Sequence, residues 1–195
     1  MSKLSRAMIE GLADARLSLA DKIGSMLAEL ESRSRYDLVL IDARAGLAEL
    51  AAGPLLTLGA NALIFGTAQP QTLDGLRFLF AHLSSLVAEE QRSPWQALKM
   101  VHAKAPLTDS TESFKDQLWE LFADFLYEEQ EGIEGFNFDA DDPAAPHCPI
   151  VIPLDTAFAD WNPTEKPGKI VEAYYTRTFQ GLLRYVDELL EQAES

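Results

Sequence analysis

The amino-acid sequence predicts an α/β domain with three layers, in which helices cover both faces of a mainly parallel sheet. Short apolar runs of strand length alternate along the chain with longer segments whose apolar residues recur every three to four positions. Repeated alternation of this kind is typical of parallel sheets. The chain has 195 residues, enough to bury one core. We therefore expect residues 1–195 to form one α/β domain.

The first half of the chain predicts an amphipathic helix followed by strands and helices in alternation. The apolar residues between Leu12 and Leu30 have the spacing of one helical face, and polar residues 31–35 end that helix. The apolar run 38–41 is too short for a helix and predicts a buried strand. The expected elements after the first helix are a strand at Tyr36–Asp42, a short helix at Leu47–Leu58, a strand at Ala62–Gly66 and an apolar helix from Pro70 or Thr72 to Val87.

The second half continues the alternation and contains one acidic loop. Its expected elements are a strand at Leu98–Ala103 after Pro94, a helix at Thr111–Gln130 capped by Thr111 or Ser113, a loop at Glu128–Pro149, a strand at Pro149–Leu154 and a final helix at Gly168–Glu191. The acidic cluster 139–142 lacks the following glycine and distal glutamate of a calcium loop. It therefore predicts a solvated turn.

Charge and cysteine content narrow the function. The chain has 16 Lys and Arg against 31 Asp and Glu, a formal net charge of −15, which disfavours direct binding to nucleic acid or anionic lipid. No apolar stretch approaches the roughly 20 residues of a membrane span, and no signal-peptide block follows Met1. We expect a cytoplasmic protein. Cys148 is the one cysteine and is expected to be a buried, small apolar side chain.

The most informative segment is residues 36–47, in which four apolar residues lead into Asp42 and then, four positions later, Gly46. A buried parallel strand would deliver Asp42 at its carboxyl end, where open α/β sheets bind ligands. A carboxylate there can hold magnesium through water. Gly46 would let the backbone approach a phosphate. Apolar runs that end in aspartate also occur in many parallel strands without such a role.

Residues 36–47 resemble the Walker B strand and switch of ParA/MinD-like P-loop ATPases, in which Asp-Ser-Pro-Ala-Gly or Asp-Ser-Arg-Ala-Gly stands at this place. Ala43 replaces the usual residue after the aspartate. The likeness covers Tyr36 to Leu86, and the remainder agrees in element order only. It implies a partial, SIMIBI-type P-loop NTPase-like fold, ATP and Mg²⁺ as cofactors, Asp42 as the metal residue, and Arg44 and Gly46 beside it. Arg44 could equally pair with a carboxylate.

The resemblance also implies residues near the nucleotide. The family often has an asparagine after the third strand and a Pro-Xaa-Asp segment after the fourth, near the adenine. This chain has His102 at the first place, and Pro153 and Asp155 at the second. Gln69 lies in the loop that leads to the helix beside the nucleotide cleft. A helix-capping loop is the alternative for Gln69, and a hydrogen-bonded strand histidine is the alternative for His102.

The phosphate-binding loop of this family is missing from the sequence. It needs Gly-Xaa4-Gly-Lys-Ser/Thr, or the family variant with an early lysine, between a strand and a helix. The pair Gly168-Lys169 is followed by Ile170 and has Pro163 where the first glycine would be, so it predicts a helix start. We therefore do not expect this chain to hydrolyse ATP alone.

Loss of the phosphate-loop strand has a structural consequence. In the family that strand lies between the Walker B strand and the next one, so Tyr36–Asp42 and Ala62–Gly66 would face a gap. Either the two strands pair directly, or an amino-terminal segment or partner protein fills the gap; a homodimer is also plausible.

The resemblance implies that the chain is the carboxyl-terminal part of an ATPase. The alternative is a non-catalytic interaction module on a degenerate scaffold. An α/β hydrolase is disfavoured, because no Gly-Xaa-Ser-Xaa-Gly segment occurs.

Overall fold

The computed structural model describes residues 19–42, 58–86, 93–106, 110–128, 136–159, 161–162, 164–166 and 168–193. The chain divides into two units, Met1–Asn61 and Ala62–Ser195. The expectation of one domain over residues 1–195 stays a prediction. Among the helices in the described ranges, none has the length and apolar character needed to cross a membrane.

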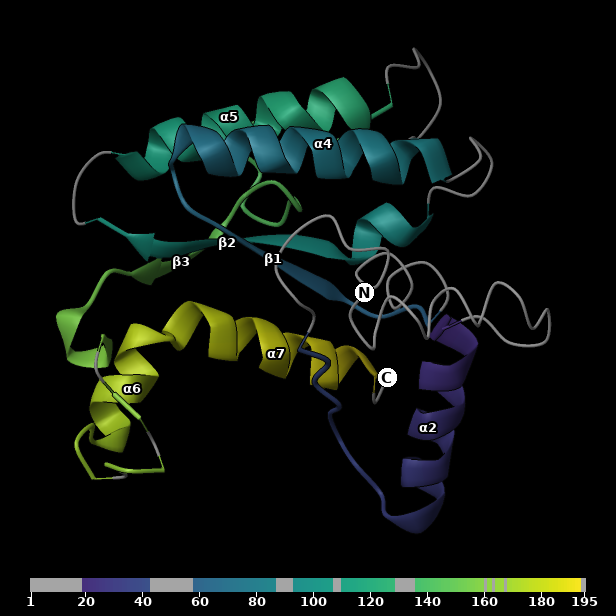
Figure 1. Ribbon diagram of the computed structural model, residues 1–195. Coiled ribbons are helices and arrows are strands. Elements are labelled where there is room, and N and C mark those ends of the chain that lie inside the picture. The colour runs from purple at the N-terminus through teal and green to yellow at the C-terminus, as the bar shows by residue number, and fades with distance from the viewer. Residues whose placement is uncertain are drawn as a thin grey trace, which may run out of the picture. The chain divides into compact units, whose positions relative to one another are not determined.

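The second unit contains a parallel sheet of three strands, β1 (Ala62–Gly66), β2 (Leu98–Ala105) and β3 (Ile150–Pro153), in the order β1-β2-β3 (Figure 1). The register places Gly66 beside His102 and Val101 beside Ile150. These strands confirm the three that the sequence predicts here, and the parallel arrangement confirms an α/β fold. Each strand coincides with an apolar run of the sequence, as expected for strands of a parallel sheet with helices on its faces.

Helices α4 (Pro70–Leu86) and α5 (Ser110–Phe125) lie together on one side of the sheet (Figure 1). They connect β1 to β2 and β2 to β3, so both crossovers run over the same face. The core between these helices and the sheet is made of large, fully buried side chains. These include Phe80, Leu98, Met100, Phe114, Leu118 and Phe122.

Gly66 allows α4 and α5 to approach the end of β1. A Cβ atom at this position would come within 3.2 Å of the Thr72 side chain and 3.3 Å of the Phe114 ring. Contacts this short require the neighbours to shift, and two packed helices resist such a shift. Gly66 therefore faces α4 and α5, and the preceding side chain, Phe65, points to the opposite face of the sheet.

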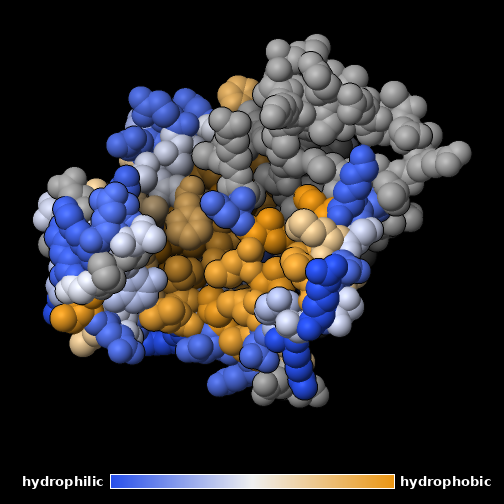
Figure 2. Space-filling model, turned by 60° about the horizontal axis from the view of Figure 1, so that its bottom comes forward, coloured by the Kyte–Doolittle hydropathy of each residue, from blue (hydrophilic) through white to orange (hydrophobic). Residues whose placement is uncertain are grey.

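Helices α6 (Glu172–Thr178) and α7 (Gln180–Ala193) follow β3, and α7 lies on the opposite side of the sheet from α4 and α5 (Figure 1). A Cβ atom at Gly181 would meet Ile150 at 3.2 Å, so α7 packs closely over β3. Figure 2 brings this side of the molecule forward and shows a broad apolar area. The Phe65 side chain on β1 is 55% exposed, so the apolar face of the sheet is incompletely covered at β1.

In the first unit the described residues form one helix, α2 (Leu19–Arg33), which is followed by a segment without regular secondary structure. The helix confirms the predicted amphipathic segment from residue 19 onward, and it runs three residues beyond Leu30. The strand predicted at Tyr36–Asp42 is wrong. Residues 34–42 form no strand, and residues 36–42 are all exposed, with Leu40 79% exposed. An apolar run becomes a strand only when a neighbour supplies backbone hydrogen bonds.

Several predicted boundaries also differ from the structure. Because α5 already includes Ser110 and ends at Phe125, neither Thr111 nor Ser113 is its cap, and the helix is shorter than predicted. The predicted final helix is two helices, interrupted at Phe179. Gly168-Lys169 lies in turns and bends ahead of Glu172, where α6 begins, and is not a helix start. The helix predicted at 47–58 lies outside the described residues except for Leu58, which is in a bend.

Candidate functional site at the carboxyl edge of the sheet

The three parallel strands end at one edge of the sheet, after Gly66, Ala105 and Pro153. Ligands of open α/β sheets bind outside this carboxyl edge. Four of the residues predicted to bind a cofactor, Gln69, His102, Pro153 and Asp155, lie on or next to these strand ends. The sheet therefore brings them to one edge, although their side chains have very different surroundings.

A tight turn joins β1 to α4. The Gln69 carbonyl accepts hydrogen bonds from the backbone N–H of Thr72, at 2.9 Å, and of Leu73, at 3.2 Å. The Thr67 and Thr72 hydroxyl oxygens are 2.9 Å apart and hydrogen bonded. The Gln69 side chain is exposed. The backbone of Gln69 thus shapes the start of α4, in line with the capping-loop alternative, while its side chain remains accessible.

His102 is fully buried beneath α5. Its ring lies 4.5 Å from the Phe114 ring, centroid to centroid, and neither ring nitrogen has a hydrogen-bond partner within the described part of the chain. Burial lowers the pKa of His102 below its usual value, because a charged imidazole is costly in an apolar environment. The predicted contact of His102 with a ligand stays a prediction. The alternative of a hydrogen-bonded strand histidine is wrong within the described part of the chain.

Lys104 places a positive charge at the carboxyl end of β2. Its backbone φ is +54°, a left-handed conformation that is uncommon for residues other than glycine. The pairing of β2 with β3 is irregular between His102 and Ala105. Lys104 is exposed, so its charge is accessible to solvent near the end of β2.

Asp155 follows β3 and anchors the next elements. One carboxylate oxygen accepts a hydrogen bond from the Ala157 N–H at 2.8 Å, and the other accepts one from the Tyr174 hydroxyl. These two hydrogen bonds, first that from Tyr174, lower the pKa of Asp155. Arg177 lies over the Tyr174 ring, 5.0 Å from its centroid. The hydrogen bond from Tyr174 thus ties α6 to the end of β3, and the one from Ala157 caps the short helical turn Thr156–Phe158, so both have a structural function.

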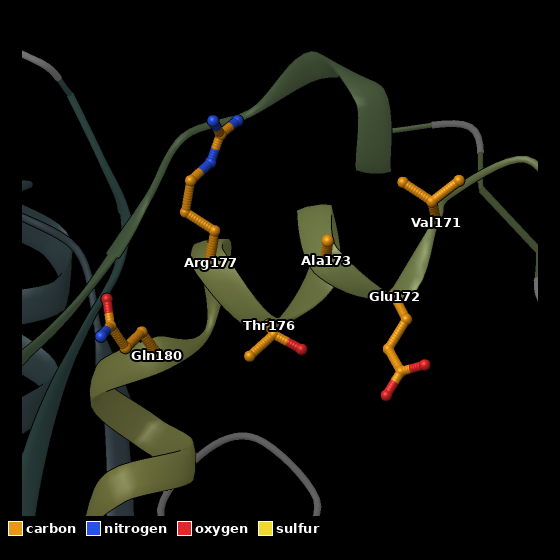
Figure 3. Close-up of a pocket in the computed structure, with 6 residues that line it drawn as sticks. All are labelled: Val171, Glu172, Ala173, Thr176, Arg177 and Gln180. Carbon is orange, nitrogen blue, oxygen red and sulfur yellow. The ribbon is translucent and has the colours of Figure 1, made fainter.

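An aromatic cluster surrounds this anchor. The Phe158 ring contacts the rings of Trp161, Tyr174, Tyr175 and Phe179 at centroid distances of 5.3 to 6.3 Å. A shallow, open pocket runs along the outer side of α6 (Figure 3). In Figure 3 the side chains of Glu172 and Arg177 point to opposite sides. They do not converge on a common position, so this pocket does not form a polar binding site.

The residues predicted to act in catalysis lie in the first unit. Asp42 is exposed in the irregular segment 34–42. Arg44 and Gly46 lie outside the described residues. Within the described ranges, no group of three or more His, Cys, Asp or Glu side chains could hold a metal ion. Magnesium is commonly bound by one or two carboxylates with water and phosphate oxygens, so the role of Asp42 stays a prediction.

The acidic cluster before β3 forms turns, as predicted. Lys115 pairs with Asp141 at 2.9 Å, and the Asp142 side chain accepts a hydrogen bond from the Ala144 N–H at 2.8 Å. Cys148 was expected to be buried and is instead half-buried. Sequence reasoning missed three buried polar residues nearby, Lys99, Tyr127 and His147. The signal in the sequence that could have revealed these buried polar residues is Lys99, a lysine inside the apolar run of β2.

Comparisons of this chain with protein-family models, with curated proteins and with solved structures found no match.

Proposed function

We propose that this chain is an α/β interaction module, which does not hydrolyse ATP alone and completes its sheet by binding a strand of an amino-terminal partner segment at β1. The observation that carries this proposal is the position of β1. It has β2 as its one paired neighbour in the described sheet, and its own residue Phe65 is largely exposed. Edge strands present unpaired N–H and C=O groups that can pair with another chain.

The surroundings of the two outer strands favour β1 over β3 as the place where a strand is added. Phe65 on β1 is more exposed than Val151 on β3, and α7 packs closely over β3.

We expect the purified chain to associate through this edge when no partner is present. The change Phe65→Lys should shift the protein towards a monomer, because a lysine on an edge strand opposes pairing. Phe65 is already largely exposed, so the free energy of unfolding should change by no more than about 0.5 kcal/mol. Size-exclusion chromatography with light scattering measures the association.

The matched control is Phe78→Lys, which adds the same charge on α4, where the side chain is 65% exposed. This variant should associate like the unmodified protein. A wild-type chain that is well folded and strictly monomeric would exclude a required partner, and equal effects of both variants would exclude β1 as the contact.

The second candidate function is the carboxyl-terminal part of a ParA/MinD-like ATPase, which the likeness of residues 36–86 to that family favours. In this case Asp42 would position magnesium once a phosphate-binding segment is added. The four residues expected near the nucleotide also lie at one edge of the sheet. However, the Asp155 carboxylate is already hydrogen bonded within the fold and the His102 ring is fully buried, which favours the interaction module.

Nucleotide assays separate the two candidates. The chain alone should release no phosphate from Mg-ATP, since the sequence has no phosphate-binding loop. If calorimetry at millimolar Mg-ATP detects no binding, the interaction module stands. In a complex reconstituted with a segment that carries a phosphate-binding loop, Asp42→Ala should abolish turnover and preserve the circular dichroism spectrum. Retained turnover would refute the role of Asp42.

A further inference from the structure

The loop before β3 is held by buried polar contacts from two other elements. From β2, the Lys99 ammonium donates a hydrogen bond to the Ala145 carbonyl at 2.8 Å, and the Met100 N–H donates to the Pro146 carbonyl at 3.0 Å. The Lys99 nitrogen also lies 3.4 and 3.5 Å from the two preceding carbonyl oxygens of the loop. The loop thus satisfies a buried lysine with backbone oxygens alone.

The second attachment joins the loop to the end of α5. His147 is fully buried, and its Nδ1 lies 2.5 Å from the Tyr127 hydroxyl oxygen, while its Nε2 lies 3.2 Å from the Ala140 carbonyl oxygen. A carbonyl can only accept a hydrogen bond, so Nε2 carries the proton. Nδ1 is therefore the acceptor and the Tyr127 hydroxyl is the donor. The contacts fix one tautomer of a neutral imidazole.

The surroundings of His147 disfavour a second proton. The rings of Phe122 and Tyr127 lie 6.2 and 5.7 Å from the imidazole, centroid to centroid. Burial, followed by the positive charges of Lys99 on β2 and Lys115 on α5, lowers the pKa of His147. The hydrogen bond with the Ala140 carbonyl and the Asp142 carboxylate oppose this shift. Protonation would place a charge beside a buried lysine and remove the acceptor of the Tyr127 hydroxyl.

We propose that the Tyr127–His147 pair is an acid-sensitive clamp, and that a proton on His147 Nδ1 releases residues 139–148 from β2 and from the end of α5. Release would expose the Lys99 ammonium and the aromatic rings beneath the loop. The clamp depends on contacts within the second unit only, so it is independent of what binds at β1 and of whether nucleotide binds at all.

Amide hydrogen exchange measured by NMR at pH 7.5 and pH 5.5 tests the clamp. The reporters are the amides of Met100, Ala145 and Cys148, which donate to the Pro146, Asp142 and Ala145 carbonyls. In the open loop the pKa of His147 should be about 6.5, so the population of the open loop should rise by up to about tenfold between pH 7.5 and pH 5.5. After correction for intrinsic exchange, the exchange rates of the reporter amides should rise by this factor at the lower pH. The exchange rates of the α4 amides should not rise.

Three variants sharpen the test. His147→Gln, which is neutral at both pH values, should lose the tenfold change. Tyr127→Phe, which removes a hydrogen bond to the neutral imidazole, should move loop opening to higher pH. His82→Gln changes an exposed histidine on α4 and should behave like the unmodified protein. The clamp is refuted if the exchange rates of the reporter amides rise no more than those of the α4 amides. It is also refuted if the His147→Gln variant keeps the tenfold rise.

A measurement on the unmodified protein keeps the clamp testable if His147→Gln does not fold. The ¹⁵N shifts of the imidazole should report a neutral ring with its proton on Nε2 until the reporter amides open. If His147 instead gains its proton near pH 6.5 while the reporters stay protected, the clamp does not exist.

Discussion

Replacing Phe114 with alanine is expected to lower the free energy of unfolding by about 3–5 kcal/mol. This ring is fully buried between α5 and the sheet, where it contacts the His102 ring and closes over Gly66. Removing it would leave a cavity that α4 and α5 cannot close without separating from the strand ends. Urea denaturation followed by circular dichroism measures the loss.

The matched control for this prediction is Phe78→Ala. Phe78 is also a phenylalanine on a helix of the same layer, but it is largely exposed, so its loss should change stability by no more than about 0.5 kcal/mol. If Phe114→Ala also costs less than about 1 kcal/mol, the packing of α5 against the ends of β1 and β2 is not as described.

The variant His102→Leu is expected to raise the free energy of unfolding at pH 7 by about 1–3 kcal/mol. Both ring nitrogens of His102 are buried without a hydrogen-bond partner among the described residues. The folded state therefore bears the cost of removing them from water and recovers none of it. Leucine has a similar size and no polar atom. Chemical denaturation measures the change, and unchanged or lower stability would show that the nitrogens have a partner.

The same variant should reduce the sensitivity of the protein to acid. Burial lowers the pKa of His102 and of His147 in the folded state, whereas in the unfolded chain both should lie near 6.5. Below this pH the unfolded chain binds protons that the folded chain does not, so stability falls as pH decreases from about 6.5 towards the folded pKa values. His102→Leu removes one of these two contributions and should flatten the decline measured between pH 7 and pH 5.

For the proposed function, the most informative feature is that some polar side chains at the carboxyl edge of the sheet are exposed while others are buried or hydrogen bonded. The polar side chains of Gln69 and Lys104 are exposed there, while His102 is buried and Asp155 is hydrogen bonded inside the fold. A ligand that binds at this edge would meet the turn after β1 and the positive charge of Lys104 near the end of β2. An aspartate that accepts two internal hydrogen bonds would contribute mainly by holding α6 in place.

The sequence correctly predicted the elements of the second unit because each one is encoded locally. The apolar runs at 62–66, 98–103 and 149–154 became strands, and the helical period at 70–86 became α4. It failed where the end of a helix depends on other parts of the chain. The interruption at Phe179 is one such case, since α6 is tied to Asp155 and α7 packs against β3.

The sequence by itself determined the alternation of elements, the acidic charge and the lack of a phosphate-binding loop, all of which are properties of residue order and composition. Only the tertiary structure decided which apolar runs are strands and which polar residues are buried. Residues 38–41 and 62–66 have similar patterns, yet only the second run has a neighbouring strand. Lys99 and His147 likewise found partners 46 and 20 residues away. Backbone pairing and buried hydrogen bonds join residues distant in sequence, and local patterns do not specify them.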